Sequence, residues 1–327
     1  MPPEKEILIS IVIPVKNGAP WLHECLQGII GQTLFNKTEI IVVDSGSTDS
    51  TSSILKQYPV HVVSINPAEF NHGLTRNYAL QFCKGNYVVM TVQDAKTVDK
   101  NWLQYLLDGF TSNDVVAVCG KQVVPHEKTT NPVDWYRPVS KGSITTYQFK
   151  DKAAFESLSP AQKMQIGSWD NVNAMYRKEA LMATTFRRIS YGEDAAWALD
   201  TISKGEKIAY TTMAMLYHYH KQDEAYAFKR TLTVMYLRYK LFGFTYDAPK
   251  RSLKSFLSMM KTILKSVNYN MAKTVYWLRY NNEILKGEKK AHKVFTAALK
   301  QGGHVLDEVH EKICGKPPVP LQATGVI

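Results

Sequence analysis

Continuous apolar runs alternate with amphipathic stretches along the first part of the chain. Residues 7–15 and 39–43 are apolar and rich in β-branched side chains, which is typical of strands buried on both faces of a parallel sheet. Between them, residues 21–32 carry apolar side chains at helical spacing. The same alternation predicts helices at 50–57 and 74–83 and strands at 60–65 and 87–92. The pattern therefore predicts an α/β fold with βαβ units and a mostly parallel sheet flanked by helices.

The pattern changes in the second half of the chain. Further strands are predicted at residues 115–125, 171–176 and 207–210, with a helix at 193–203. After residue 220 the segments are helical and rich in basic residues. We therefore predict two parts, an α/β domain over residues 1–220 and a basic helical segment over residues 221–327.

Charge is distributed unevenly between these two parts. Residues 1–220 hold 21 basic and 21 acidic side chains, whereas residues 221–327 hold 19 basic and 8 acidic ones and so account for the whole net charge of +11. A basic segment of this kind indicates an anionic partner, either membrane or nucleic acid, or a surface kept soluble by its charge. An apolar fraction of 45% excludes a disordered or low-complexity chain.

Two further features bear on the compartment. No apolar run approaches the roughly 18 residues that span a bilayer, and residues 1–6 lack the apolar core of a signal peptide. The four cysteines lie far apart without a CxxC pair, which is typical of reduced thiols. We therefore expect a cytoplasmic protein.

Polar motifs follow several of the predicted strands, where α/β sheets bind their ligands. The motif DSGSTDST (residues 44–51) is typical of a capped strand-to-helix turn. However, Asp44 ends a buried strand, where a carboxylate needs a partner, and the ring N–H of uracil or thymine is a suitable one. In FNHGLTRN (residues 70–77), Gly73 permits close approach of a ligand, and Arg76 offers a fork suited to a diphosphate. His72 alone is more typical of packing or capping than of catalysis.

Three acidic or histidine motifs complete the set. Asp94 follows a strand in QDA, and such a carboxylate beside a diphosphate is a natural ligand for Mg²⁺ or Mn²⁺. Glu193 and Asp194 open a predicted helix, where acids also stabilise the helix dipole without any catalytic role. In YHYH, His218 and His220 share one face of a strand, so they are candidate metal ligands, although surface pairs at this spacing are common.

The ordered set PVKNG, VDSGSTDST, FNHGLTRN, QDA and GEDAAW resembles the family 2 glycosyltransferases, which have the Rossmann-like GT-A fold. The combination of FNHG, RN and QDA is similar to bacterial rhamnosyltransferases that use dTDP-L-rhamnose. The resemblance extends from residue 7 to about residue 220.

The resemblance implies roles for individual residues. Asp44 would contact the nucleotide base, and Gly73 and Arg76 would line the diphosphate side. Asp94 matches the last acid of the DXD metal motif, whose first acid is replaced here by Val92. Asp194, with Glu193 beside it, matches the general base of inverting enzymes. The other predicted donor-site residues are Pro14, Lys16, Asn17, Ser45, Asn71, His72, Gln93 and Trp197, and the candidates for the missing metal ligand are His218 and His220.

The basic segment contains one strongly amphipathic stretch. On a helical wheel of residues 250–267, Lys250, Lys254, Lys261 and Lys265 gather on one side, opposite Leu253, Phe256, Leu257, Met260, Ile263, Leu264 and Val267. The pattern fits a helix in an anionic membrane interface, and equally a helix packed by its apolar face on the catalytic domain. The glycosyltransferase resemblance favours the membrane, because polysaccharide acceptors are often built on lipid carriers. The periodic apolar face and the lack of a binding motif disfavour nucleic acid.

Together these observations predict an inverting, metal-assisted glycosyltransferase at the inner face of the cytoplasmic membrane. It would transfer a sugar, L-rhamnose from dTDP-L-rhamnose, to a saccharide or lipid-linked saccharide in cell-surface polysaccharide or lipopolysaccharide synthesis. Two alternatives stay open within the fold, a UDP-hexose donor and a polyprenyl-phosphate acceptor. The alternative from another class is a non-catalytic basic protein that binds membranes.

Overall fold

The computed structural model describes residues 7–138 and 141–315. The predicted segments that fall on residues 1–6, 139–140 and 316–327 lie outside the described residues. Contacts divide the chain into two compact units, Met1–Val123 with Val139–His218, and Val124–Pro138 with Tyr219–Ile327. The sequence placed residues 124–138 in the first domain. The structure groups them with the carboxyl-terminal helices, because Asn131 and Asn281 exchange side-chain hydrogen bonds of 3.0 Å and Val133 packs on Trp277 and its neighbours.

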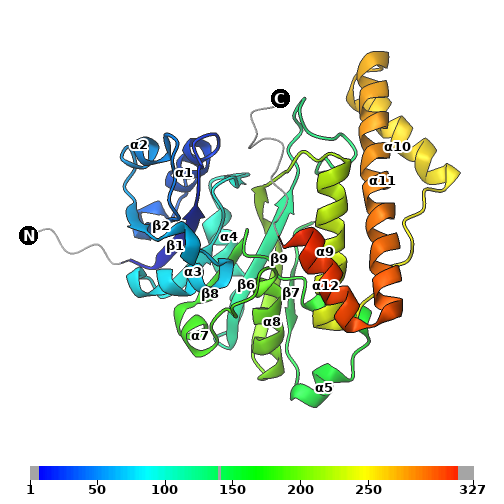
Figure 1. The fold of residues 1–327 in the computed structure, drawn as a ribbon. Helices are drawn as coiled ribbons and strands as arrows, with labels where there is room; N and C mark the ends of the chain where they lie inside the picture. Colours follow the sequence, from blue (N-terminus) through cyan, green and yellow to red (C-terminus); the bar gives the residue numbers. More distant parts are fainter. Residues whose placement is uncertain (1–6, 139–140, 316–327) are drawn as a thin grey trace, which may run out of the picture. The chain divides into compact units, whose positions relative to one another are not determined.

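The first unit is built on a mixed, nine-stranded sheet (Figure 1). The strand order is β3 (His61–Ser64), β2 (Thr38–Asp44), β1 (Ile9–Val15), β4 (Tyr87–Met90), β8 (Ala174–Arg177), β6 (Val115–Val123), β9 (Lys207–Tyr217) and β5 (Lys96–Thr97), and β7 (Ile144–Tyr147) pairs with β9. The first four strands are parallel, as predicted. β8 runs antiparallel to both of its neighbours, so parallel pairing does not continue across the sheet.

Helices cover both faces of this sheet because its central strands are apolar on both sides. Along β1, Ile11 and Ile13 face one core and Val12 faces the other, as the two-residue period of a strand requires. The first core includes side chains of α1 (Leu22–Ile30), α2 (Thr51–Leu55) and α4 (Trp102–Asp108). The second includes side chains of α3 (His72–Ala79), α5 (Lys152–Glu156), α6 (Pro160–Ile166), α7 (Lys178–Ala183) and α8 (Glu193–Ser203). In the described part of this unit, short 3-10 helices lie at Phe35–Lys37, Pro67–Glu69 and Leu80–Phe82.

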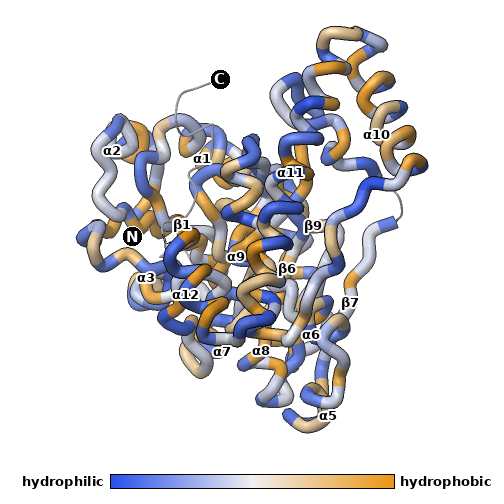
Figure 2. The backbone as a smooth tube through the Cα atoms, turned by 45° about the vertical axis from the view of Figure 1, so that its right-hand side comes forward, coloured by the Kyte–Doolittle hydropathy of each residue, from blue (hydrophilic) through white to orange (hydrophobic). Residues whose placement is uncertain are grey.

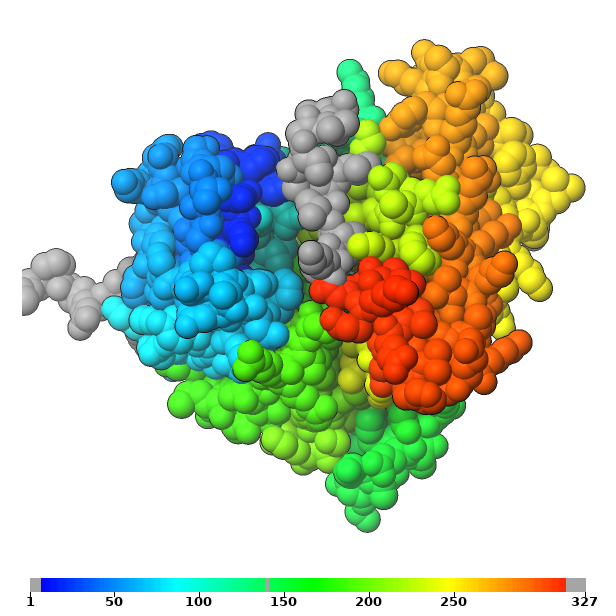
Figure 3. Space-filling model, viewed as in Figure 1, coloured from blue at the N-terminus to red at the C-terminus, as the bar shows by residue number. Residues whose placement is uncertain are grey.

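The described part of the second unit is helical. It contains α9 (Glu224–Phe242), α10 (Leu253–Ser266), α11 (Met271–Gln301) and α12 (Gly303–Cys314). One apolar core joins α9, α11 and α12, which lie side by side in Figure 3, and a smaller one joins α10 to α11. Gly287 lets α11 approach α9, since a Cβ there would lie 2.6 Å from the carbonyl oxygen of Glu224. Among the described residues, none of the helices is both long enough and apolar enough to cross a membrane.

Candidate active site

The predicted site residues gather at one edge of the sheet of the first unit. β1, β2 and β4 are parallel, so their carboxyl ends, followed by Lys16, Ser45 and Gln93, lie at the same edge. β8 is antiparallel to β4, and therefore begins where β4 ends. The hydroxyl of Thr91 donates to the carbonyl of Val172 over 2.9 Å across this junction. The loop that leads into β8 thus belongs to the same site as the ends of the parallel strands.

Side-chain hydrogen bonds join the first three strand ends. Asn17 has a positive φ of 49°; its backbone N–H donates to the Ser47 hydroxyl (2.9 Å) and its Oδ1 accepts from the Thr48 N–H (2.8 Å). The Gln93 amide accepts from the backbone N–H of Lys16 (2.9 Å) and donates to its carbonyl (3.1 Å). The side chains of Asn17 and Gln93 therefore shape the site, whereas the side chain of Lys16 is exposed beside it.

Asp44 lies at the centre of this loop cluster. Its Oδ1 accepts from the backbone N–H of Ser47 (3.0 Å) and from the Ser47 hydroxyl (2.6 Å). Among the described residues, its Oδ2 accepts no hydrogen bond. The carboxylate is half-buried, so one oxygen is oriented by the loop and the other can accept from a ligand.

Two predicted donor-site side chains are instead part of the framework. The Ser45 hydroxyl is buried and donates to the Val15 carbonyl (3.1 Å), so it joins β1 to β2. Trp197 is 0% exposed, packs in the core beneath α8, and donates its indole N–H to the Thr184 carbonyl (2.6 Å). Neither side chain has surface with which to touch a donor. Pro14 is half-buried and pairs with Val43 in the sheet.

The FNHG motif connects α3 to the loop before α8. Asn71 caps α3 by accepting from the Leu74 N–H (3.1 Å), and its amide donates to the Ile189 carbonyl (2.9 Å). A Cβ at Gly73 would lie 2.5 Å from the carbonyl oxygen of Arg187, so glycine is required here by protein packing. His72 is exposed next to Phe70, with ring centroids 4.9 Å apart.

Arg76 does not lie at the surface, where the resemblance placed it beside a diphosphate. It is 3% exposed, and its Nη1 donates to Glu193 Oε1 over 2.6 Å and to the His72 carbonyl over 3.2 Å. Its Nε is buried and has no partner among the described residues. The physical reason is that buried Glu193 requires a cationic partner, and Arg76 supplies it.

Asn171 organises the two acids of the GEDAAW motif. Its side-chain amide donates to Glu193 Oε1 (3.3 Å), and its backbone N–H donates to Asp194 Oδ2 (3.2 Å). The amide is oriented in turn by the Tyr176 hydroxyl, which donates to Asn171 Oδ1 over 2.6 Å. Sequence reasoning treated residue 171 only as the start of a strand. The only sequence signal was its place in the polar turn SWDN before an apolar run.

Asp194 differs electrostatically from its neighbour Glu193. Burial, together with the negative charges of Glu193 and Asp170, raises the pKa of Asp194 to about 8, while the hydrogen bonds from Ala195 and Asn171 act in the opposite direction. Glu193 is neutralised by Arg76, whereas Asp194 accepts only backbone N–H groups in the described residues. Asp194 is thus a carboxyl group whose pKa lies near neutral pH, as expected of a general acid or base.

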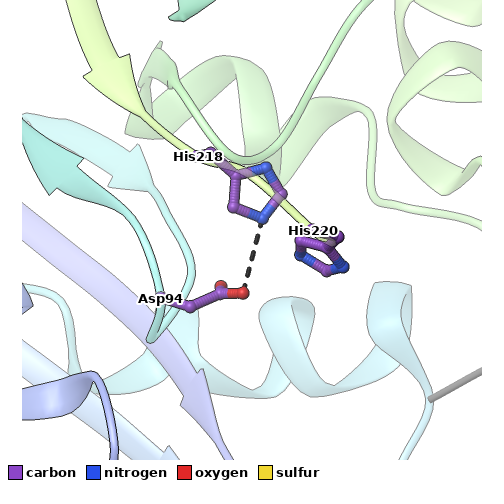
Figure 4. A group of neighbouring side chains, drawn as sticks. All are labelled: Asp94, His218 and His220. Atoms are coloured by element: carbon purple, nitrogen blue, oxygen red, sulfur yellow. Dashed lines mark ion pairs between the residues drawn. The ribbon is translucent and has the colours of Figure 1, made fainter. Parts of the chain in front are cut away.

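Asp94, His218 and His220 form a group that can hold a metal ion (Figure 4). One ligand atom from each lies within 4.8 Å of the others, and His218 Nε2 is 3.5 Å from Asp94 Oδ2. His218 Nδ1 lies 2.6 Å from the amide oxygen of Gln122, which fixes the ring with Nε2 toward Asp94. His220 Nδ1 lies 2.9 Å from the hydroxyl of Tyr226. Outer partners of this kind are typical of metal-binding histidines. Gln122 and Tyr226 carried no signal in the sequence.

The loop around Asp44, the metal-ligand group and a carboxyl group with a raised pKa thus lie at the carboxyl ends of the parallel strands, where α/β sheets bind their ligands. The model of the Glycosyl transferase family 2 matches residues 10–184, and the chain belongs to this family. The O-antigen chain rhamnosyltransferase WbaN of Salmonella anatum is 33% identical over 228 residues, 68% of this chain and 69% of WbaN. RfbN of Salmonella typhimurium, also an O-antigen chain rhamnosyltransferase, is 28% identical over 235 residues, 68% of this chain and 69% of RfbN.

The fold is also similar to that of a solved enzyme. The mannosyltransferase PcManGT from Pyrobaculum calidifontis, in complex with GDP-Man and Mn²⁺, superimposes with a TM-score of 0.53 at 17% identity, covering 95% of this chain and 87% of PcManGT. The GT-A fold and glycosyltransferase family expected from the sequence are therefore confirmed.

Proposed function

We propose that the protein transfers L-rhamnose, with inversion, from dTDP-L-rhamnose to a saccharide acceptor in cell-surface polysaccharide or lipopolysaccharide synthesis. The similarity to two O-antigen chain rhamnosyltransferases supports this donor. The observation that carries the proposal is one sheet edge that brings together Asp44, the metal-ligand group containing Asp94, and Asp194 with its raised pKa. Sugar transfer from a nucleotide requires a contact to the nucleotide, positive charge for the departing diphosphate and a base for the acceptor hydroxyl, and these three groups can supply them.

Asp44 is the proposed contact to the nucleotide base. Thymine and uracil present a ring N–H, which a carboxylate oxygen accepts. Ser47 holds Oδ1 and leaves Oδ2 as the acceptor. Lys16, exposed beside this loop, is placed to attract the anionic donor.

Asp94, His218 and His220 are the proposed metal ligands. A set with one carboxylate and two imidazoles favours Mn²⁺ over Mg²⁺, which prefers oxygen ligands throughout. When bound, the metal would supply positive charge for the departing diphosphate. The replacement of the first DXD acid by Val92 is then balanced by the histidines. Arg76 has no share in this role, because its charge is used by Glu193.

Asp194 is the proposed general base. Its carboxylate takes the proton of the acceptor hydroxyl as the acceptor oxygen bonds to the anomeric carbon and the bond from that carbon to the diphosphate breaks. A single displacement of this kind inverts the configuration and needs no covalent nucleophile. Asn171 is the positioning residue. Its backbone N–H holds Asp194, and its side-chain amide holds Glu193.

A screen of nucleotide sugars tests the donor assignment. The unfolding temperature is measured with dTDP-L-rhamnose, UDP-glucose and GDP-mannose, each with and without Mn²⁺, and transfer is followed by release of the nucleotide diphosphate. The proposal expects dTDP-L-rhamnose with Mn²⁺ to give the largest stabilisation and the fastest release. A larger effect of UDP-glucose would replace dTDP-L-rhamnose as the assigned donor, and the absence of any effect of a nucleotide sugar would contradict the assignment as a transferase.

We also propose that the acceptor is carried on a lipid at the inner face of the cytoplasmic membrane.

A further inference from the structure

Helix α10 has two apolar faces, and only one of them is covered by protein. Met259 and Ile263 are buried against Trp277 and Tyr280 of α11. Leu253 and Leu257, on another face of α10, are 74% and 47% exposed, and Phe256 between the two faces is also exposed. The covered face packs on α11 of the same unit, whereas the packing alternative drawn from the sequence placed the apolar face on the catalytic domain. Figure 2 shows the apolar colouring along α10.

Lysines lie directly beside the uncovered face. At about 100° per residue, Lys254 and Lys261 follow the direction of Leu257 around the helix, on the side away from Met259. Both lysines are exposed. This order, with an apolar strip and then a row of lysines, lets the aliphatic stems lie along the apolar strip while the ammonium groups reach outward.

Further large apolar side chains are exposed at the turn after α10 and at the start of α11. Met271 is 67% exposed, and Tyr269, Val275 and Tyr276 are exposed with it. Tyr269 belongs to the turn between the helices, where its positive φ of 58° allows the tight reversal. Large apolar side chains clustered at the turn of a hairpin are unusual on a surface that meets only water.

The charge of the hairpin identifies what covers this surface. Residues 250–282 contain seven basic residues and no acidic one. A self-associating surface would bring these charges together and repel itself, whereas an anionic lipid layer would neutralise them and accept the apolar side chains. We propose that the uncovered face of α10 and the turn into α11 form a docking surface for anionic lipid membrane. This inference rests on the membrane location included in the proposed function, and it names the surface of the protein that binds the membrane.

Vesicle co-sedimentation tests this proposal without donor or acceptor. The probes are vesicles of equimolar phosphatidylcholine and phosphatidylglycerol, and vesicles of phosphatidylcholine alone. The full chain should bind the anionic vesicles, and the double variant Leu253→Ser/Leu257→Ser should lower the partition constant at least about tenfold. Lys254→Gln/Lys261→Gln should lower it about fivefold per charge removed, and added salt should mimic this loss.

A matched control tests whether the loss of any exposed apolar side chain weakens vesicle binding, or only the loss of those on this surface. Met182 on α7 of the other unit is exposed to the same extent as Met271, so Met182→Ser should bind vesicles like the unmodified chain. Absence of binding to anionic vesicles, or equal binding by both double variants and the control, would overturn the proposal. So would dimerisation in solution that Leu253→Ser/Leu257→Ser abolishes without any vesicle binding by the parent chain. Because no sugar transfer is measured, these outcomes leave the proposed transferase activity untouched.

Discussion

Arg76 Nη1 lies 2.6 Å from Glu193 Oε1, and both side chains are more than nine-tenths buried. The two residues are 117 positions apart, in the two motifs that open α3 and α8. The ion pair therefore joins the FNHG region to the loop and helix that carry Asp194. Of the two neighbouring acids Glu193 and Asp194, only Glu193 therefore has a cationic partner among the described residues.

Removing Arg76 should destabilise the fold. Arg76→Met leaves Glu193 charged and buried, so we expect a loss of about 3–5 kcal/mol in the free energy of unfolding, measured by urea denaturation. The double variant Arg76→Met/Glu193→Gln should recover a large part of this loss, since it removes the stranded charge. An Arg76→Met protein of unchanged stability and weakened donor binding would return Arg76 to the diphosphate site.

The pH dependence of transfer should report Asp194. As a base, Asp194 acts when it is ionised, and its pKa is raised to about 8. We therefore expect kcat/KM to rise with pH through a midpoint near that value and to level off above it. Glu193→Gln removes one of the negative charges that raise this pKa and leaves the Arg76 cation nearby. The midpoint should therefore move to lower pH. A profile that is flat above pH 6, or a midpoint that moves upward in Glu193→Gln, would argue against Asp194 as the titrating base.

Asp44→Ala should weaken nucleotide binding while leaving the fold intact. Loss of a hydrogen bond to a charged acceptor reduces affinity by at least about tenfold, which calorimetry with dTDP can measure. Asp114 is a suitable control, because it precedes β6 and thus lies at the opposite edge of the sheet. Asp114→Ala should bind dTDP normally. Equal affinities for Asp44→Ala and the parent chain would remove Asp44 from the donor site.

Metal-stimulated turnover should depend on Asp94 and His218. Asp94→Asn and His218→Gln should lose this stimulation, with a much smaller effect on dTDP affinity in metal-free buffer. Gln122→Met removes only the partner of His218 Nδ1 and should weaken Mn²⁺ binding about 10–100-fold, measured by titration with Mn²⁺. Turnover that is insensitive to a chelator in the parent chain would exclude a metal role for this group.

The sequence predicted the strands and the edge at which the site forms, because both depend on local patterns. The apolar runs at 7–15 and 39–43 became β1 and β2, and the polar residues after them, including Asp44, meet at the edge. The ion pair that buries Arg76 against Glu193 could not be predicted. It depends on which of several polar groups becomes buried, and therefore on packing between segments more than a hundred positions apart.

Asn171 and the two faces of α10 show the same limit. Nothing local distinguishes Asn171 from other polar residues in turns; its role arises because β8 begins beside the end of β4. On α10, Met259 and Leu257 are both apolar, and only the position of α11 decides that one is buried and the other exposed. Periodicity predicts a helix and its faces but does not show which face another helix covers.

The substitution Asp194→Asn tests the central claim most directly. It keeps the size of the side chain, and its one carbonyl oxygen can accept from one of the two backbone N–H groups that Asp194 binds, so donor affinity should be retained and the unfolding temperature should fall only slightly. Loss of the base should reduce transfer by at least about a hundredfold, measured by single-turnover rates at saturating donor and metal. Glu193→Gln should lose less. Near-normal transfer by Asp194→Asn would contradict the assignment of Asp194 as the general base.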